Sequence, residues 1–144
     1  MAISTKNTRK DFQRLTRYRI VESRALLRAK HPAGAYYLAG YAVECALKAC
    51  IAKNTKRYEF PDKKLADKCY SHDLEQLLGT AGLQAVYDQE IKAKPQLAVN
   101  WATTKDWKET TRYDVNINIR QAKQLYQSIT AKRYGVLTWL RKYW

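Results

Sequence analysis

The sequence predicts a single all-α domain over residues 1–144, and three observations lead to that prediction. Hydrophobic residues make up 46% of the 144 residues, which suffices for a packed core at this length. The chain has only five Gly and three Pro, too few turn-forming residues for a β-sandwich of this size. Its long apolar segments place hydrophobic residues at the spacing of a helix face. Helices joined by a few longer loops fit all three observations.

The first helix is expected from about Arg9 to Lys30, because Pro32 and Gly34 end the helical pattern. Its predicted buried face consists of Leu15, Tyr18, Ala25, Leu26 and Ala29. A separate stripe of basic residues at helical spacing consists of Lys10, Arg14, Arg17, Arg24 and Arg28. Residues 1–31 hold nine Lys and Arg against two acidic residues, a net charge of +7 out of +14 for the chain. This concentration of charge favours a polyanionic partner, with a merely solvated surface as the alternative.

The second helix is expected from about Ala35 to Lys53, and it is apolar around most of its circumference. Its polar positions form one narrow strip, which consists of Tyr37, Tyr41, Glu44 and Lys48. Such a helix is buried on most sides. We therefore expect packing within the chain together with a subunit contact, that is, a homodimer. Glu44 and Lys48 are four residues apart and are expected to form a structural ion pair, with a catalytic acid–base pair as the alternative.

Shorter elements are expected in the rest of the chain. A polar, Lys-rich connection leads to a short helix over residues 72–78, and another short helix is expected over 83–94. The segment 101–114 fits no element clearly. A last long helix begins near Val115, and Gly135 bends it or divides it in two.

The cysteines and the termini indicate a cytoplasmic protein. Cys45, Cys50 and Cys69 are an odd number without CxxC spacing, as expected for reduced thiols rather than for disulfides or a zinc site. The first ten residues contain no apolar signal core, and no apolar run approaches the roughly 18 residues that span a bilayer. The motifs of P-loop NTPases, dinucleotide-binding folds and zinc enzymes do not occur, so neither a metal nor a cofactor is expected.

The segment 35–49, AYYLAGYAVECALKA, resembles the signature helix of HEPN domains. Later features agree in order, and they are Phe60-Pro61, His72-Asp73-Leu74, the Trp-rich segment ending in Arg112-Tyr113, and Ala122 ahead of Leu125-Tyr126. The resemblance covers about residues 10–140. It implies an antiparallel bundle of four to five helices, here with short extra helices between the second and last long helices. It also implies a homodimer that works on RNA or nucleotides, often in defence or toxin–antitoxin systems and beside a minimal nucleotidyltransferase.

Many HEPN proteins are metal-independent ribonucleases that carry an Arg, four to six residues and then a His on a late helix. In this chain no His follows Arg112, and the only histidines are His31 and His72. Arg24 and His31 have the required spacing, but they lie in the first helix and its exit. About half a match of this kind is expected by chance in this composition, so we interpret the pair as a coincidence. The sequence therefore predicts no ribonuclease activity of the HEPN type.

The sequence leads to three alternative hypotheses about the function. The favoured one is an RNA- or nucleotide-binding module whose candidate contacts are Lys10, Arg14, Arg17, Arg24, Arg28 and Arg112. Trp101 and Trp107 are candidate stacking surfaces for bases. The first alternative is a ribonuclease in which Arg112 holds phosphate and His72 comes from elsewhere in the dimer, although a capping or packing role for His72 is preferred. The second alternative is a non-catalytic partner of a nucleotidyltransferase.

Overall fold

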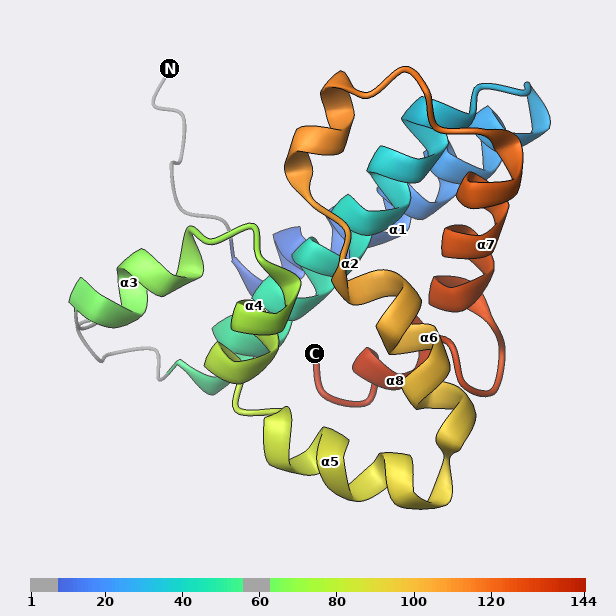
Figure 1. The fold of residues 1–144 in the computed structure, drawn as a ribbon. Coiled ribbons are helices and arrows are strands. Elements are labelled where there is room, and N and C mark those ends of the chain that lie inside the picture. The colour runs from blue at the N-terminus through green and yellow to red at the C-terminus, as the bar shows by residue number, and fades with distance from the viewer. Residues whose placement is uncertain (1–7, 56–62) are drawn as a thin grey trace, which may run out of the picture.

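The computed structural model describes residues 8–55 and 63–144, and all regular elements within these ranges are helical (Figure 1). The long helices are α1 (Arg9–Arg28), α2 (Pro32–Asn54) and α7 (Ile119–Thr130). The shorter elements are α3 (Lys63–Cys69), α4 (Leu74–Thr80), α5 (Gln84–Ala93), α6 (Pro95–Lys105), the 3-10 helix η1 (Glu109–Tyr113) and α8 (Val136–Leu140). The predicted all-α fold is confirmed over these residues.

Helix α1 begins and ends at signals that the sequence contains. The Thr8 hydroxyl accepts a hydrogen bond from the Asp11 backbone N–H at 3.2 Å, and the Asp11 carboxylate accepts from the Thr8 N–H at 2.9 Å. After the helix, Lys30 adopts a left-handed backbone with φ of 62°, which turns the chain back. Pro32 then starts α2, because the first helical position needs no N–H donor. Helices α1 and α2 consequently run side by side in opposite directions (Figure 1).

Small polar side chains make the contact between α1 and α2. The Thr16 hydroxyl donates to the carbonyl oxygen of Phe12 in its own helix and lies 3.2 Å from the Ala42 carbonyl of α2. The Ser23 hydroxyl donates to the Ala35 carbonyl at 2.7 Å. Both hydroxyl-bearing residues are fully buried, so each is satisfied where it meets α2.

The buried face predicted for α1 is partly wrong. Tyr18, Ala25 and Ala29 are exposed, with 51% of Tyr18 accessible, while Leu15 and Leu26 are half-buried. The contact line of α1 is instead formed by Thr16 and Ser23, whose hydroxyls bond to carbonyl oxygens of α2, and Tyr18, Ala25 and Ala29 lie away from this line.

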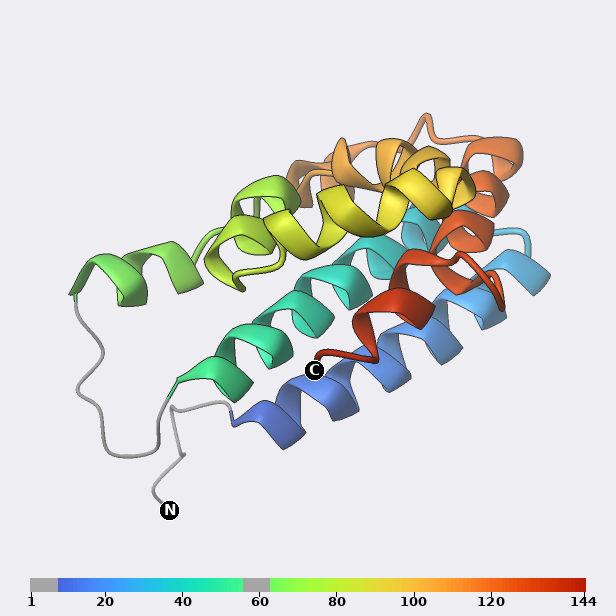
Figure 2. The same ribbon diagram turned by 90° about the horizontal axis from the view of Figure 1, so that it is seen from below.

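Helix α2 is the centre of the fold. It contacts α1, α4, η1, α7 and α8, and Figure 2 shows it between α1 and the layer that contains α4, α5 and α6. Twelve of its residues are buried within this single chain. The prediction of a largely buried helix is therefore confirmed, and its burial requires no second subunit. The homodimer stays a prediction that now needs a different argument.

The cysteines are free thiols. Cys45 and Cys50 are buried on α2, and burial raises the pKa of each thiol to about 12. Cys69 is half-buried at the end of α3. Buried thiols with such a high pKa are not nucleophiles at neutral pH.

The segment 101–114 folds as the end of α6 and as η1, and it places its tryptophans in the core. Trp101 is 5% exposed and Trp107 is 1% exposed. Trp107 packs so tightly on Gly40 of α2 that a Cβ atom at position 40 would overlap the indole ring. The prediction that Trp101 and Trp107 offer stacking surfaces is therefore wrong, because Trp107 fills the space above Gly40 and Trp101 packs in the core beside Tyr87.

The closing segment is divided in two. Asn118 caps α7 through its side chain, which accepts from the Gln121 backbone N–H at 2.8 Å. The helix thus begins four residues after the predicted start at Val115. Gly135 separates α7 from α8, and a Cβ atom there would overlap the Ala131 carbonyl oxygen. The second of the two alternatives predicted for Gly135 is the correct one.

Phe60 and Pro61, which belong to the HEPN-like pattern, lie outside the described residues. Among the helices of residues 8–55 and 63–144, none combines the length and the hydrophobicity needed to cross a membrane.

Candidate functional site

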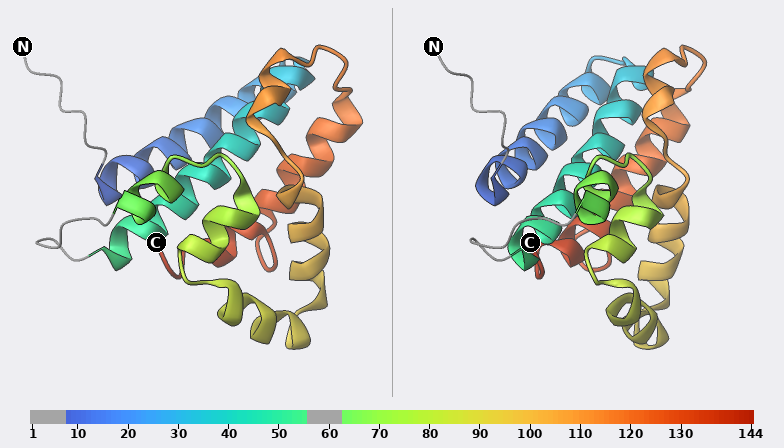
Figure 3. Two further views of the ribbon diagram at one scale, coloured as in Figure 1. Left: turned by 60° about the vertical axis from the view of Figure 1, so that its left-hand side comes forward. Right: turned by 90° about the vertical axis from the view of Figure 1, so that its left-hand side faces the viewer.

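The outer face of α1 carries the largest concentration of exposed charge that we identify. Its five basic residues, which we call the basic face, are Lys10, Arg14, Arg17, Arg24 and Arg28, and all of them are exposed. Helix α1 lies at the edge of the molecule, with its inner side on α2 (Figure 3). From Lys10 to Arg28 the face extends for about 27 Å along the helix, at the usual rise per residue.

The carboxylates of α1 are occupied elsewhere. Asp11 belongs to the N-terminal cap, and the hydrogen bonds from the Thr8 backbone and side chain lower its pKa. Glu22 pairs with Arg19 at 2.7 Å, beside the basic face rather than within it. Within the described residues no carboxylate forms an ion pair with any member of the basic face. Its positive charge is consequently available to a partner.

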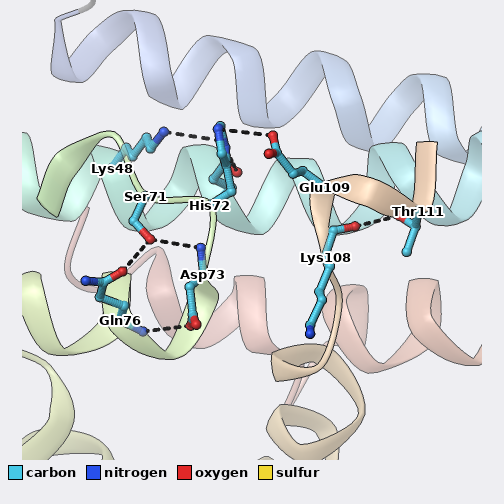
Figure 4. A network of polar contacts seen from close by, with 9 residues as sticks. Lys48, Ser71, His72, Asp73, Gln76, Lys108, Glu109 and Thr111 are labelled. Carbon is cyan, nitrogen blue, oxygen red and sulfur yellow. Dashed lines mark hydrogen bonds and ion pairs between the residues drawn. The ribbon is translucent and has the colours of Figure 1, made fainter. Parts of the chain in front are cut away.

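A second polar site lies over α2, and we call it the His72 cluster. It consists of Glu44, Lys48, His72 and Glu109, the last three of which are labelled in Figure 4. One Glu44 oxygen lies 2.8 Å from His72 Nδ1, and the other accepts from Lys48 Nζ at 3.3 Å. His72 Nε2 lies 3.1 Å from a Glu109 oxygen. The cluster thus joins α2, the connection between α3 and α4, and η1.

Local hydrogen bonds fix the position of His72. The Asp73 side chain caps α4 by accepting from the Gln76 N–H at 3.1 Å. The Ser71 hydroxyl accepts from the Asp73 N–H at 3.0 Å and donates to the Gln76 side chain at 2.6 Å (Figure 4). The residue on each side of His72 is therefore bound to the start of α4. This arrangement aims the imidazole ring at the Glu44 carboxylate, which is only 2% exposed.

The geometry of the His72 cluster indicates a structural role. Both ring nitrogens of His72 face carboxylate oxygens, Nδ1 that of Glu44 and Nε2 that of Glu109. A ring held in this way has no free nitrogen with which to accept a proton from a substrate. The two carboxylates lie at opposite nitrogens, and no three metal-ligating side chains converge within the described ranges.

Aromatic rings complete the polar strip of α2. Tyr37 stacks on Trp107 with ring centroids 5.9 Å apart, and on Tyr41 at 6.0 Å. Burial raises the pKa of Tyr41 to about 12, with the neighbouring Cys45 and Glu44 adding to the effect. Tyr41 is therefore a neutral phenol at physiological pH. Of the predicted polar strip, Glu44 is buried, whereas Tyr37, Tyr41 and Lys48 are half-buried.

Arg112 lies in η1, three residues after Glu109, and its guanidinium is exposed. It sits 4.8 Å from the centroid of the Tyr113 ring. A side-chain hydrogen bond with Tyr113 is the main cause of a raised Arg112 pKa, to which the charge of Glu109 also contributes. Arg112 thus lies in the same 3-10 helix as Glu109, the carboxylate that contacts His72 Nε2.

The pair Arg24 and His31 forms no site. Arg24 is exposed on α1, and His31 is exposed at the N-terminal cap of α2 without a capping hydrogen bond from its side chain. No hydrogen bond joins the two residues. Their arrangement is consistent with a coincidental spacing.

Three residues near these sites were missed by the sequence analysis. Glu109 carried no signal, because its segment fits no element and its partner His72 lies 37 residues earlier. Tyr18 was assigned to the core, and Trp144 was not considered. Arg14 lies 5.7 Å from the Tyr18 ring centroid, and Arg17 lies 5.2 Å from the Trp144 ring centroid. The signal that could have pointed to Tyr18 and Trp144 is the row of basic residues on α1, because aromatic rings often lie next to exposed arginines.

Comparisons of the chain with protein-family models, with curated proteins and with solved structures gave no match in any of the three.

Proposed function

We propose that this protein is a HEPN-like module that binds RNA through the basic face of α1 and does not cleave it. The observation that carries the proposal is the exposure of five cations on one helix face without an ion-pair partner among the described carboxylates. The resemblance of the segment 35–49 to the HEPN signature helix adds the RNA-related context. It also suggests a defence or toxin–antitoxin setting. The homodimer and the nucleotidyltransferase partner stay predictions.

The length of the basic face favours a polynucleotide over a single nucleotide. A face of about 27 Å is longer than any mononucleotide and presents its cations in a row. A row of cations can neutralise successive phosphates of one backbone, and each neutralised phosphate releases counterions. A mononucleotide would use only one end of the face.

The absence of cleavage is proposed from the His72 cluster. General acid–base catalysis needs a nitrogen that can exchange a proton with the substrate. Both nitrogens of His72 are occupied by Glu44 and Glu109, and among the described residues no side-chain hydrogen bond or ion pair joins His31 to another titratable group. The chain therefore offers no imidazole ready for this chemistry in the observed conformation.

The experiment is a titration of labelled RNA with purified protein at several salt concentrations. In the triple variant Arg14→Glu, Arg17→Glu, Arg24→Glu, we expect weaker binding to every sequence and a log–log salt slope flatter by roughly 2. The matched control reverses Lys92, Lys108 and Lys132 to Glu, three exposed cations outside α1. It changes the net charge equally and should retain most of the affinity. Equal losses in both variants would refute a site on α1.

One observation favours the ribonuclease as a second candidate function. His72 Nε2 contacts Glu109, which lies in the same 3-10 helix as Arg112, and displacement of Glu109 by a substrate phosphate would free this nitrogen while Glu44 still oriented the ring. The same samples decide this point. Metal-independent cleavage of RNA that His72→Ala abolishes, with helicity unchanged, would establish this candidate and contradict the non-cleaving module.

A further inference from the structure

Two aromatic rings border the basic face of α1. Tyr18 is 51% exposed, and the Arg14 guanidinium lies 5.7 Å from its ring centroid. Trp144 is half-buried, and its ring centroid lies 5.2 Å from the Arg17 guanidinium and 5.8 Å from that of Arg141. The chain end reaches α1 after α8 (Figure 2), and Arg9 donates a hydrogen bond to the Trp144 carbonyl oxygen.

The rings lie at two different edges of the basic face. Arg17 and Tyr18 are consecutive, so their side chains leave the helix about 100° apart. Trp144 lies at the edge of Arg17, and Tyr18 lies at the opposite one, beside Arg14. A backbone that follows the cations would therefore have a flat ring within reach on either side.

We propose that Tyr18 and Trp144 stack on unpaired bases, which makes the ligand of the basic face single-stranded RNA rather than a duplex; this inference rests on the proposed function. Bases stack on aromatic side chains only when their own faces are free. In a duplex the faces are covered by neighbouring base pairs, so a duplex gains only the phosphate contacts. Cations combined with aromatic rings are the arrangement that single-strand-binding proteins use.

Charge disfavours a second copy of this chain as the occupant. A symmetric dimer through α1 would place the basic face opposite an identical basic face. The chain has a net charge of +14, and half of it lies in residues 1–31. Like charges in direct opposition resist association, whereas a polyanion is attracted to the same surface.

The fluorescence of Trp144 provides a direct test. The other three tryptophans, Trp101, Trp107 and Trp139, are at most 5% exposed. A single strand of uridylates should therefore quench only the emission of Trp144 when it stacks. We expect quenching that saturates with binding in the wild type and is lost in Trp144→Phe. Binding measured by anisotropy without any quenching would overturn the stacking role of Trp144.

Affinity measurements test both rings and the choice of strand. We expect the double variant Tyr18→Leu, Trp144→Leu to bind single-stranded RNA about tenfold more weakly, with little change in duplex binding and in the salt slope. The control Tyr70→Leu removes a tyrosine that is 78% exposed outside α1, and it should bind like the wild type. Equal losses for single strand and duplex would overturn the proposal. So would an unchanged affinity together with a change of oligomeric state in light scattering, which would identify a subunit interface. If the wild type binds no RNA at all, the proposed function itself fails.

Discussion

The basic face of α1 and the His72 cluster over α2 differ in whether their charged side chains form ion pairs within the chain. On α1, five cations stand in solvent, and the two acidic residues of the helix are engaged by a cap and by Arg19. Over α2, Glu44 is almost fully buried and meets both Lys48 and His72, while Glu109 meets the other nitrogen of His72. Charges that satisfy one another hold elements together. Charges left without a partner are available for binding.

This difference separates the residues that stabilise the fold from those that we propose to bind RNA. Changes around the His72 cluster should alter the free energy of unfolding and leave the salt dependence of RNA binding unchanged. Changes on the basic face should do the reverse. The predictions below test the contrast from its largest expected effect to its smallest.

The largest effect is expected from Gly40→Ala. The added Cβ atom would overlap the Trp107 ring, which is buried, rigid and stacked on Tyr37 beside the cluster. We expect a loss of about 3 kcal/mol in the free energy of unfolding, the upper end for an overpacked core. Urea denaturation measures it.

Gly79→Ala is the matched control for this change. Gly79 lies within α4, and a Cβ atom there would meet nothing within 4 Å. The substitution should raise stability by roughly 0.5–1 kcal/mol through helix propensity. Equal effects at the two positions would contradict the close contact between α2 and Trp107.

The second prediction concerns His72→Leu. The change leaves the buried Glu44 carboxylate with Lys48 alone, and an unsatisfied buried acceptor typically costs about 1–3 kcal/mol. The double variant Glu44→Leu, His72→Leu removes the buried charge as well and should recover part of that loss. A double-mutant cycle by urea denaturation gives the coupling energy. A coupling energy near zero would show that the contact between Glu44 and His72 does not stabilise the fold.

The contrast between the two regions also explains how much of the structure the sequence could predict. The spacing of residues along the chain was enough to predict the helices α1 and α2. It also predicted the polar strip of α2 and the exposure of the five cations of the basic face. The contact between His72 and Glu109 joins residues 37 apart across a segment without a pattern. The burial of Trp107 depends on Gly40, and the sequence does not distinguish this glycine from the other small residues of α2. Tyr18 was misplaced because hydroxyl residues, not apolar ones, mark the contact line of α1.

The third prediction uses the thiols of α2. Burial raises the pKa of Cys50 to about 12 in the folded protein, whereas an unfolded thiol ionises near pH 8.5. The unfolded state therefore loses protons first as the pH rises, and stability falls between these two values. Between pH 7 and 9 the wild type should lose about 1 kcal/mol more than Cys50→Ala. Replacing the half-buried Cys69 by Ala should change this pH dependence less. Parallel curves for the wild type and Cys50→Ala would contradict the buried thiol.

The smallest effect on the free energy of unfolding is expected from Arg24→Glu, and here it matters whether the change raises or lowers stability. Arg24 and Arg28 are like charges four residues apart on the exposed side of α1, and such pairs destabilise a helix slightly. The substitution turns this repulsion into an attraction, with the carboxylate on the favourable N-terminal side. We expect a gain of about 0.3–0.5 kcal/mol in thermal or urea denaturation at low salt. RNA affinity should fall in the same variant, because one phosphate contact is replaced by a repulsive charge. A residue whose charge serves ligand binding and not the fold should show this combination, in which the substitution raises the free energy of unfolding and lowers the affinity for RNA.

Arg24→Gln serves as the control, since it removes the repulsion without adding a carboxylate. It should lie between the wild type and Arg24→Glu in both stability and RNA affinity. A loss of stability in Arg24→Glu would instead mean that the basic face has a partner within the chain, and the contrast with the His72 cluster would no longer hold.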